Sequence, residues 1–260
     1  MALPTDIQWY SDPSKLHSLP FPSLHQVQKN RFNFNKQGFF TYIGREKFSK
    51  IVDVVNKGDS VKLNIYGTIG YGKSHILAAL ACYFTRMGRP VFYIPDSAAL
   101  VSKFIISVTE AFLLACAHPS RRHHWPEILK IRSVEDAIRF SDVTHEDFVY
   151  IVDQFDAVDV KKSGSRSDDR VITVAHSLEA IAAARHRRVV IESASPNSRS
   201  YVKLTQTRGD ENLFLFGGMS DVSTPLISLE KRQHPFTDRD ESVVGPVGRG
   251  KPTPYFHGPR

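Results

Sequence analysis

The sequence predicts an α/β fold: a doubly wound, mostly parallel sheet of about five strands between two layers of helices, with disordered tails. Two observations indicate this fold. Short apolar runs alternate along the chain with longer stretches whose apolar residues recur at helical spacing. A glycine-rich loop also joins the strongest apolar run, Val61–Tyr66, to an amphipathic stretch from Ser74 to Met87. Strands that alternate with crossover helices form parallel sheets.

The remaining elements follow in order after this first strand and helix. Further strands are predicted at Val91–Ile94, Phe148–Val152, Val189–Ile191 and Leu213–Phe216. Further helices are predicted from Asp96 or Ser97 to about Ala117, from Ser133 onward, and over roughly Val171–His186. Ser133 and Asp136 have the spacing of a capping box, and Gly88 has the position that a C-cap glycine prefers. Residues 118–132 are expected to form a polar insertion, in which Arg121, Arg122, His123 and His124 belong to a solvated basic loop.

Composition divides the chain into three parts. Residues 1–38 are rich in Pro, Ser, Asn and isolated aromatic residues without a helical or strand period, so they predict a loosely ordered N-terminal arm. Residues 39–229 carry the alternating pattern of the folded domain. Residues 230–260 are basic, aperiodic and rich in Pro and Gly, which predicts a disordered tail.

The charge and cysteine content exclude some classes of protein. The net charge is +7, but residues 41–230 hold 24 basic and 22 acidic residues, so the excess lies in the tails. Nucleic-acid binding is therefore left open for the basic tails alone. No run approaches ~18 apolar residues and no secretory signal is visible, so no membrane partner is expected. Cys82 and Cys116 are expected to be reduced thiols in the core.

The glycine-rich loop has the pattern of a phosphate-binding loop. Residues 67–74 read GTIGYGKS and match G-x-x-x-x-G-K-[ST], with a strand before and a helix after. Gly67, Gly70 and Gly72 would allow backbone N–H groups to point inward, Lys73 would reach the β- and γ-phosphates, and Ser74 would bind Mg²⁺. The pattern predicts a P-loop NTPase that binds ATP and Mg²⁺.

A second acidic position supports this interpretation. Asp153 directly follows the buried strand Phe148–Val152, at the sheet edge where open α/β sheets bind ligands. We expect Asp153 to hold Mg²⁺ through its water shell. Gln154 and Asp156 are the two candidates for positioning the attacking water, since Gln154 stands where many related ATPases have a glutamate. Asp156 could equally be a solvated loop acid.

Two further positions are candidates for contacting the nucleotide. The strand predicted at Val189–Ile191 ends in Ser193, Ser195 and Asn197, where related ATPases carry a polar residue that senses the γ-phosphate; Ser195 is the candidate, and a simple turn is the alternative. Arg45 lies in the segment Tyr42–Glu46, whose hydrophobic-Gly-Arg-Glu pattern packs near adenine in AAA+ and STAND ATPases. The start of a helix is the alternative explanation for this segment.

Five phrases of the sequence resemble the P-loop NTPase region of Crinkler effectors and related retrotransposon-hot-spot type proteins: IYGTIGYGKSHILAALACYF, GRPVFYIPD, YIVDQFDAV, VIESASPN and LFGGMS. The resemblance covers roughly residues 39–220. It implies an AAA+/STAND-like NTPase and a secreted effector that acts inside a host cell. Residues 1–40 contain no LFLAK-like segment and residues 231–260 no nuclease-like pattern, so neither delivery nor nuclease activity is expected.

Three functions remain in view. The preferred one is slow ATP hydrolysis. The second is a nucleotide-gated interaction module that acts through a protein partner or an oligomer, which Gln154 in place of a glutamate motivates. A small-molecule kinase is disfavoured because no Arg-rich lid is visible in the sequence. The physiological partner and compartment are not indicated by the residues themselves.

Overall fold

The computed structural model describes residues 3–24, 31–57, 61–67, 70–158, 169–183, 189–194 and 211–215. The disordered tail expected at 230–260 lies outside the described residues. Five parallel strands form the main sheet in the order β4-β5-β6-β3-β7. Their bounds are β3 Val61–Tyr66, β4 Val91–Ile94, β5 Val149–Val152, β6 Val189–Ala194 and β7 Glu211–Phe214. The predicted doubly wound α/β fold is confirmed.

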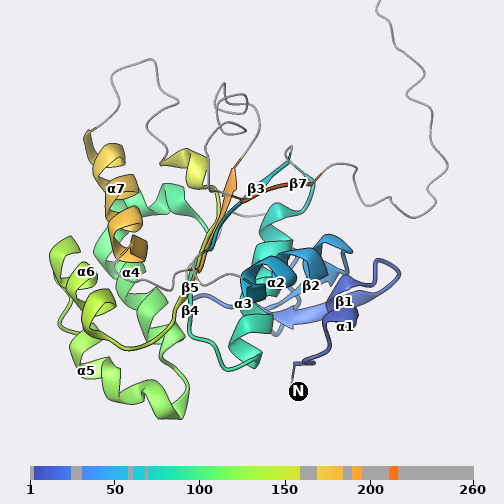
Figure 1. The fold of residues 1–260 in the computed structure, drawn as a ribbon, viewed down its shortest axis with the longest axis horizontal. Coiled ribbons are helices and arrows are strands. Elements are labelled where there is room, and N and C mark those ends of the chain that lie inside the picture. The colour runs from blue at the N-terminus through green and yellow to red at the C-terminus, as the bar shows by residue number, and fades with distance from the viewer. Residues whose placement is uncertain are drawn as a thin grey trace, which may run out of the picture. The chain divides into compact units, whose positions relative to one another are not determined.

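Helices cover both faces of this sheet (Figure 1). On one face lie α1 Ile7–Ser11, α2 Lys47–Lys57 and α3 Lys73–Arg86. On the other lie α4 Leu100–Ala115, α5 Trp125–Ile128, α6 Val134–Val143 and α7 Asp169–Ala183. Among the described residues, three 3₁₀ helices connect these elements: η1 Ser97–Ala99, η2 Pro119–His124 and η3 Phe155–Ala157.

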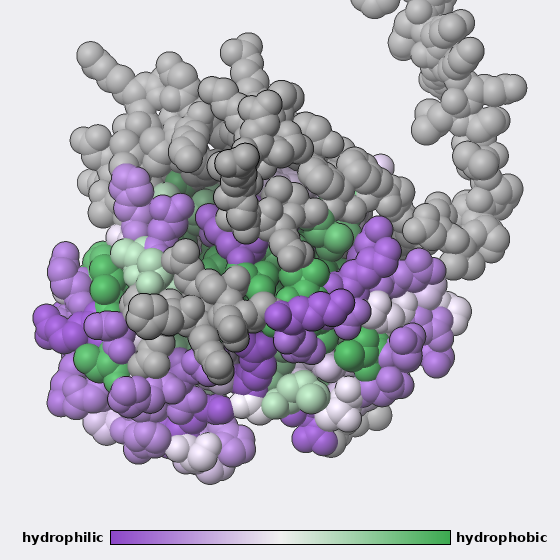
Figure 2. All heavy atoms as spheres, in the orientation of Figure 1, coloured by the Kyte–Doolittle hydropathy of each residue, from purple (hydrophilic) through white to green (hydrophobic). Residues whose placement is uncertain are grey.

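Two hydrophobic cores lie between the sheet and its two helical layers. Along β5, Val149 and Ile151 belong to the core under α2 and α3, whereas Tyr150 and Val152 belong to the core under α4 to α7. This alternation follows from the two-residue period of a strand. Because both faces are buried, β4 and β5 consist only of aliphatic and aromatic residues, which is why they were predicted from short apolar runs. Figure 2 shows hydrophobic residues gathered near the middle of one face and hydrophilic ones around them.

Most predicted element boundaries agree with the structure to within one or two residues. The capping box of Ser133 and Asp136 is present at the start of α6, and Gly88 has a left-handed φ of 78° just beyond α3. The last strand begins two residues earlier than predicted, and β6 extends three residues further, to Ala194. Cys82 and Cys116 are both buried and free, as expected.

The prediction of a loosely ordered arm over residues 1–38 is wrong for much of that segment. It contains α1 and β1 Leu16–Pro20, and β1 pairs antiparallel with β2 Phe39–Ile43. Tyr10 and Leu19 are fully buried in the core that also contains α3. The sequence hides this strand because its two inward residues are His17 and Leu19, so hydropathy does not alternate as it does in most half-buried strands.

The polar insertion expected at residues 118–132 is also structured. It forms η2 and α5, with Ile128 and Ile131 buried in the second core. The Trp125 indole N–H donates to the Cys116 carbonyl at 3.0 Å and anchors α5 to the end of α4. The apolar residues of this stretch are confined to its last seven positions before Arg132, and the rest is polar, so composition alone suggested a solvated loop.

Within the described ranges one stretch, Ser97–Ala115, is long and apolar enough to cross a membrane by composition alone. In the structure it comprises η1 and α4 and bends at Lys103. Its buried residues, among them Val108 and Phe112, belong to the core that also contains Phe92 of β4. The Phe92 and Phe112 rings are 4.8 Å apart between centroids.

Candidate functional site

The glycine-rich loop lies where the sequence predicts, between β3 and α3. Gly70 and Gly72 have φ angles of 89° and 74°, a region that favours glycine. A Cβ atom at Gly72 would lie 2.5 Å from Nη2 of Arg45, so a side chain there would also require the end of the Arg45 side chain to shift. The backbone therefore turns sharply into α3 with an arginine directly against it. Thr68 and Ile69 of the same loop lie outside the described residues.

The first turn of α3 carries Lys73 and Ser74. Gly72 occupies the N-cap position, no side chain caps the helix, and no acidic residue lies in the first turn. The orphan N–H groups and the helix dipole at such an end favour an anion. The Lys73 ammonium donates to the Gly67 carbonyl, so its side chain folds back over the loop. Lys73 and Gly67 are thus in contact within the loop.

Asp153 lies at the carboxyl end of β5 and is almost completely buried, with 1% of its side chain exposed. Its Oδ1 accepts hydrogen bonds from the Gln154 backbone N–H at 2.9 Å and from the Ser193 hydroxyl. Burial raises the pKa of the Asp153 carboxyl, while Arg31 and the hydroxyls of Ser193 and Ser74 oppose that rise. The carboxylate therefore depends on a neighbouring cation for its charge.

That cation is Arg31, which sequence reasoning missed. Its Nη2 donates to Asp153 Oδ2 at 2.5 Å and to Ser74 Oγ at 3.0 Å, and its Nε lies 3.2 Å from the same Oγ. One guanidinium thus bridges the two oxygens that the sequence assigned to magnesium. The Arg31 side chain is 10% exposed.

Aromatic packing explains why Arg31 lies there. The adjacent Phe32 is buried in the core of α3, with its ring 4.7 Å from that of His75 and 5.4 Å from that of Phe40. Phe34 also bridges to Phe40 in antiparallel fashion. The only sequence signal for this arrangement is the alternation of aromatic with polar residues in Arg31–Phe34, which is typical of an extended segment with one buried face.

Arg45 lies against the phosphate loop, as its contact with Gly72 shows. The N-terminal segment holds it there: the Arg45 N–H donates to the Tyr10 carbonyl at 3.0 Å, and the Gly44 N–H donates to the Lys15 carbonyl at 3.1 Å. A Cβ atom on Gly44 would collide with the Asp12 backbone, so this close approach requires glycine. Arg45 also lies two residues before α2 begins at Lys47, as the helix-start interpretation of this segment expects.

His75 follows Ser74 on α3. Burial, together with the positive charges of Arg45 and Arg31, lowers the pKa of His75 to about 4. The imidazole is therefore neutral at physiological pH. Its ring packs against Phe32 and Phe40 as part of the wall beside the loop.

The predicted water-positioning residues are described unequally. Gln154 has a left-handed φ of 57°, which is uncommon for a residue with a side chain. Its backbone is held by the Ser193 hydroxyl, which accepts its N–H at 3.1 Å, and by the Ser97 hydroxyl, which donates to its carbonyl. Asp156 lies in η3 and only its backbone is described. Ser195 lies outside the described residues, whereas Ser193 of β6 contacts Asp153 directly.

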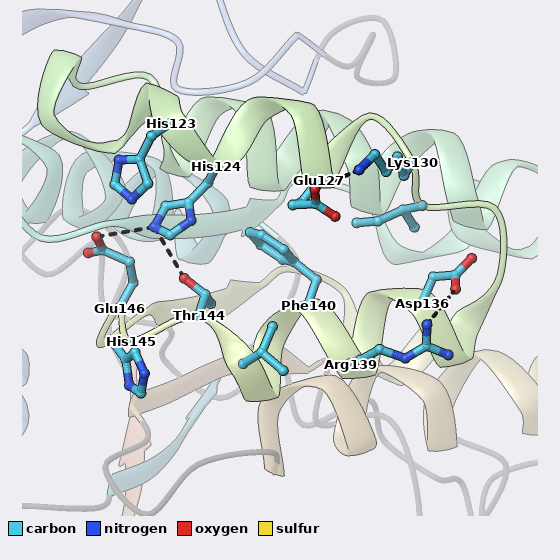
Figure 3. A pocket seen from close by; sticks show the side chains of 12 residues that line it. His123, His124, Glu127, Lys130, Asp136, Arg139, Phe140, Thr144, His145 and Glu146 are labelled. Carbon is cyan, nitrogen blue, oxygen red and sulfur yellow. Dashed lines mark hydrogen bonds and ion pairs between the residues drawn. The ribbon is translucent and has the colours of Figure 1, made fainter.

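A separate pocket of about 430 Å³ lies at the other edge of the sheet (Figure 3). It is formed by η2, α5, α6 and the residues before β5. It therefore lies near the amino end of β5, whereas Asp153 lies at the carboxyl end of that strand. Its charged residues pair with each other, as in Lys130–Glu127 at 2.6 Å and His124–Glu146 at 3.6 Å. Among the described residues, no group of three or more His, Cys, Asp or Glu could hold a metal ion.

Arg121 and Arg122 next to this pocket, expected to belong to a solvated basic loop, both have partners. Arg121 donates to Glu146 at 2.6 Å and to the Gly88 carbonyl at 2.6 Å. Arg122 lies over the Trp125 ring at 5.4 Å. These contacts give the two arginines a structural role in fixing η2.

The parallel sheet, with the glycine-rich loop between β3 and α3, defines the P-loop NTPase class of fold. No family model and no curated protein matches the chain. Similar solved structures include AMPPCP-bound DnaA from Aquifex aeolicus, at 14% identity and a TM-score of 0.36, covering 64% of this chain and 44% of that one. A DNA replication initiation factor matches at 15% identity and a TM-score of 0.35, covering 66% and 47%. The chain spans less than half of either protein, and similarities this low carry no functional argument.

Proposed function

We propose that this chain binds ATP with Mg²⁺ at the loop Gly67–Ser74 and hydrolyses it slowly. The observation that carries the proposal is the bridging of Ser74 Oγ and Asp153 Oδ2 by a single nitrogen of Arg31. Two oxygens from the helix start and from the end of β5 are thereby within reach of one cation. A hydroxyl and a carboxylate in that position suit a magnesium ion that keeps most of its water and phosphate ligands.

The phosphate subsite is supported by the charge around the loop. Lys73 lies over the loop, Arg45 packs against Gly72, and the helix end adds partial positive charge without an acidic residue in its first turn. A triphosphate bound there would exchange the Lys73 contact with Gly67 for contacts with its β- and γ-oxygens. Mg²⁺ would neutralise part of the remaining phosphate charge.

Hydrolysis requires a water that attacks the γ-phosphorus as the bond to the β-phosphate oxygen breaks, giving ADP and inorganic phosphate. Gln154 can orient this water by hydrogen bonding but cannot accept its proton. Asp156, two residues further, would accept the proton if its carboxylate faces the γ-phosphate. The absence of a carboxylate at position 154 is the reason that slow turnover is proposed.

Membership of the Crinkler-type group of AAA+/STAND-like NTPases is part of this proposal and rests on the sequence phrases alone. A nucleotide-gated interaction module is the second candidate. Gln154 favours this candidate, because its side chain cannot accept the proton of the attacking water. Its backbone is nevertheless fixed by Ser97 and Ser193 and donates its N–H to Asp153. Such a site binds Mg²⁺–ATP without needing to turn it over.

Calorimetric titration of ATP in the presence of Mg²⁺ tests the binding site. Lys73→Ala should weaken ATP binding at least about 100-fold, because the phosphates lose their cation at the loop. Lys50→Ala, which removes an exposed lysine of α2, is the matched control and should bind ATP as the wild type does. Equal ATP affinity in the Lys73→Ala and Lys50→Ala variants would rule out this site.

Phosphate release by the same samples separates the two candidate functions. Loss of turnover in Asp156→Ala with ATP binding intact would identify Asp156 as the base, whereas loss in Gln154→Ala alone would assign water positioning to Gln154. A wild-type protein that binds ATP but releases phosphate no faster than buffer supports the nucleotide-gated module.

A further inference from the structure

We propose that Arg31 is a latch that competes with Mg²⁺ at the nucleotide site, so that binding of metal and ATP releases the segment carrying it. This inference rests on the proposed function, since it describes how that same site is regulated. Arg31 reaches across 43 positions to Ser74 and 122 positions to Asp153. The latch is therefore built by tertiary packing.

The geometry makes occupation by the two cations mutually exclusive. Arg31 Nη2 lies 3.0 Å from Ser74 Oγ and 2.5 Å from Asp153 Oδ2. A magnesium ion held directly by Ser74, or through its waters by Asp153, needs the same space between these oxygens, since its ligands lie about 2.0–2.1 Å away. Metal binding must then displace the guanidinium.

The guanidinium is also incompletely satisfied where it lies. In the described part of the chain, Arg31 Nη1 is buried and has no hydrogen-bond partner, and the same holds for the Tyr93 hydroxyl on β4. A buried donor without a partner opposes the conformation that contains it. The closed latch is thus stabilised through Asp153 and Ser74 and destabilised at Nη1, as expected of a contact that must open.

Release of Arg31 would be transmitted to the N-terminal segment. Phe32 packs against His75 of α3 and Phe40 of β2, and Phe34 bridges to Phe40. β2 leads directly into Arg45, which lies against Gly72 of the loop. The residues around Arg31 therefore contact both the metal site and the loop, and their position would report which ligand is bound.

The test is the Mg²⁺ concentration that gives half-maximal ATP binding, measured by titrating Mg²⁺ into protein with ATP present. Arg31→Ala should lower that concentration about tenfold, because the competing cation is gone. Lys36→Ala is the matched control: it removes an exposed positive charge from the same segment and should leave the Mg²⁺ dependence unchanged. Arg31→Gln keeps a long polar side chain without charge and should lower the half-maximal Mg²⁺ concentration as Arg31→Ala does. It takes the place of Arg31→Ala if the alanine variant does not fold.

Two results would overturn the latch. An unchanged Mg²⁺ requirement in both Arg31 variants would show that Arg31 does not compete with the metal. Weaker ATP binding in both, with and without Mg²⁺, would make Arg31 a direct phosphate ligand instead. Lys73→Ala separates failure of the latch from failure of the proposed function. If Lys73→Ala still binds ATP normally, the proposed nucleotide site and the latch are both wrong. If Lys73→Ala no longer binds ATP but Arg31→Ala leaves the Mg²⁺ dependence unchanged, only the latch is wrong.

Discussion

His17 shows how a single buried residue makes stability depend on pH. It lies on β1 with 6% of its surface exposed, and its ring is 3.6 Å from that of Trp9. Within the described residues its Nε2 has no hydrogen-bond partner. Burial lowers the pKa of His17, and the hydrogen bond to the Trp9 backbone only partly opposes this. The folded protein therefore favours the neutral imidazole more than the unfolded chain does.

The sign of the pH dependence follows from linkage. In the unfolded chain a histidine titrates near its ordinary pKa of about 6.5, so below that pH the unfolded state binds more protons than the folded state. Stability should fall as the pH falls from 6.5 through the lower folded pKa. His17→Phe keeps the aromatic contact with Trp9 and should show a smaller loss of melting temperature between pH 7.5 and 5.5. His145→Phe, at an exposed position, is the control and should match the wild type; equal losses in both variants would contradict the assignment.

At the residue scale, the sequence predicted the part of the site that is local in the chain. Lys73 and Ser74 follow the loop directly, and Asp153 follows a strand that its apolar run reveals. Arg31 could not be found this way, because its position depends on Phe32 entering a core made by residues far along the chain. Ser193 was placed at a strand end by the sequence, but its hydrogen bond to Asp153 depends on β6 lying next to β5.

At the scale of elements, local chemistry fixes where several helices begin. In α6 the Ser133 hydroxyl accepts the Asp136 N–H at 3.2 Å, and the Asp136 carboxylate accepts the N–H groups of Ser133 and Arg132. Three N–H groups near the start of the helix thus have partners. Because these contacts span at most four residues, the sequence was sufficient to predict them.

Removing the cap should destabilise the protein by a measurable amount. Ser133→Ala leaves the Asp136 N–H without its partner and should cost about 1 kcal/mol, or about 2–4 °C in melting temperature for a domain of this size. Ser102→Ala is the control, since it removes an exposed hydroxyl of α4 that donates to the Ala99 carbonyl at the end of η1. Thermal unfolding followed by circular dichroism measures both. An Ser133→Ala variant as stable as Ser102→Ala would mean that α6 is held by packing alone.

Strands were predicted well only where both faces are buried. The bounds of β3 and β4 were predicted correctly, because β4 contains no charged or amide residue and apolar residues recur at every second position of β3. β6 continues past Ile191 through Glu192 and Ser193, both buried, and their polarity concealed the continuation. β1 was missed because its inward face includes a histidine. In each case the tertiary environment, rather than hydropathy, determines the element.

At the scale of the molecule, the N-terminal segment is part of the main core. Tyr10 stacks on Phe48 of α2 at 4.9 Å, and its hydroxyl donates to the Pro4 carbonyl at 3.1 Å. The thiol of Cys82 on α3 donates to the Pro20 carbonyl at 3.2 Å. The segment also supplies Arg31 and supports Arg45. Folding of the site and folding of this segment are therefore coupled.

Two leucines of residues 1–38 distinguish an integrated segment from a loose arm. Leu19 is fully buried and Leu24 is 67% exposed. Leu19→Ala should destabilise the protein by about 2–5 kcal/mol, since it removes apolar contacts and leaves a cavity in the core of α3. Leu24→Ala should change stability by less than about 0.5 kcal/mol. Urea unfolding of the two variants gives both values. A loose arm requires the two changes to be equally mild, whereas a large cost confined to Leu19→Ala would establish that the P-loop core extends to the first strand of the chain.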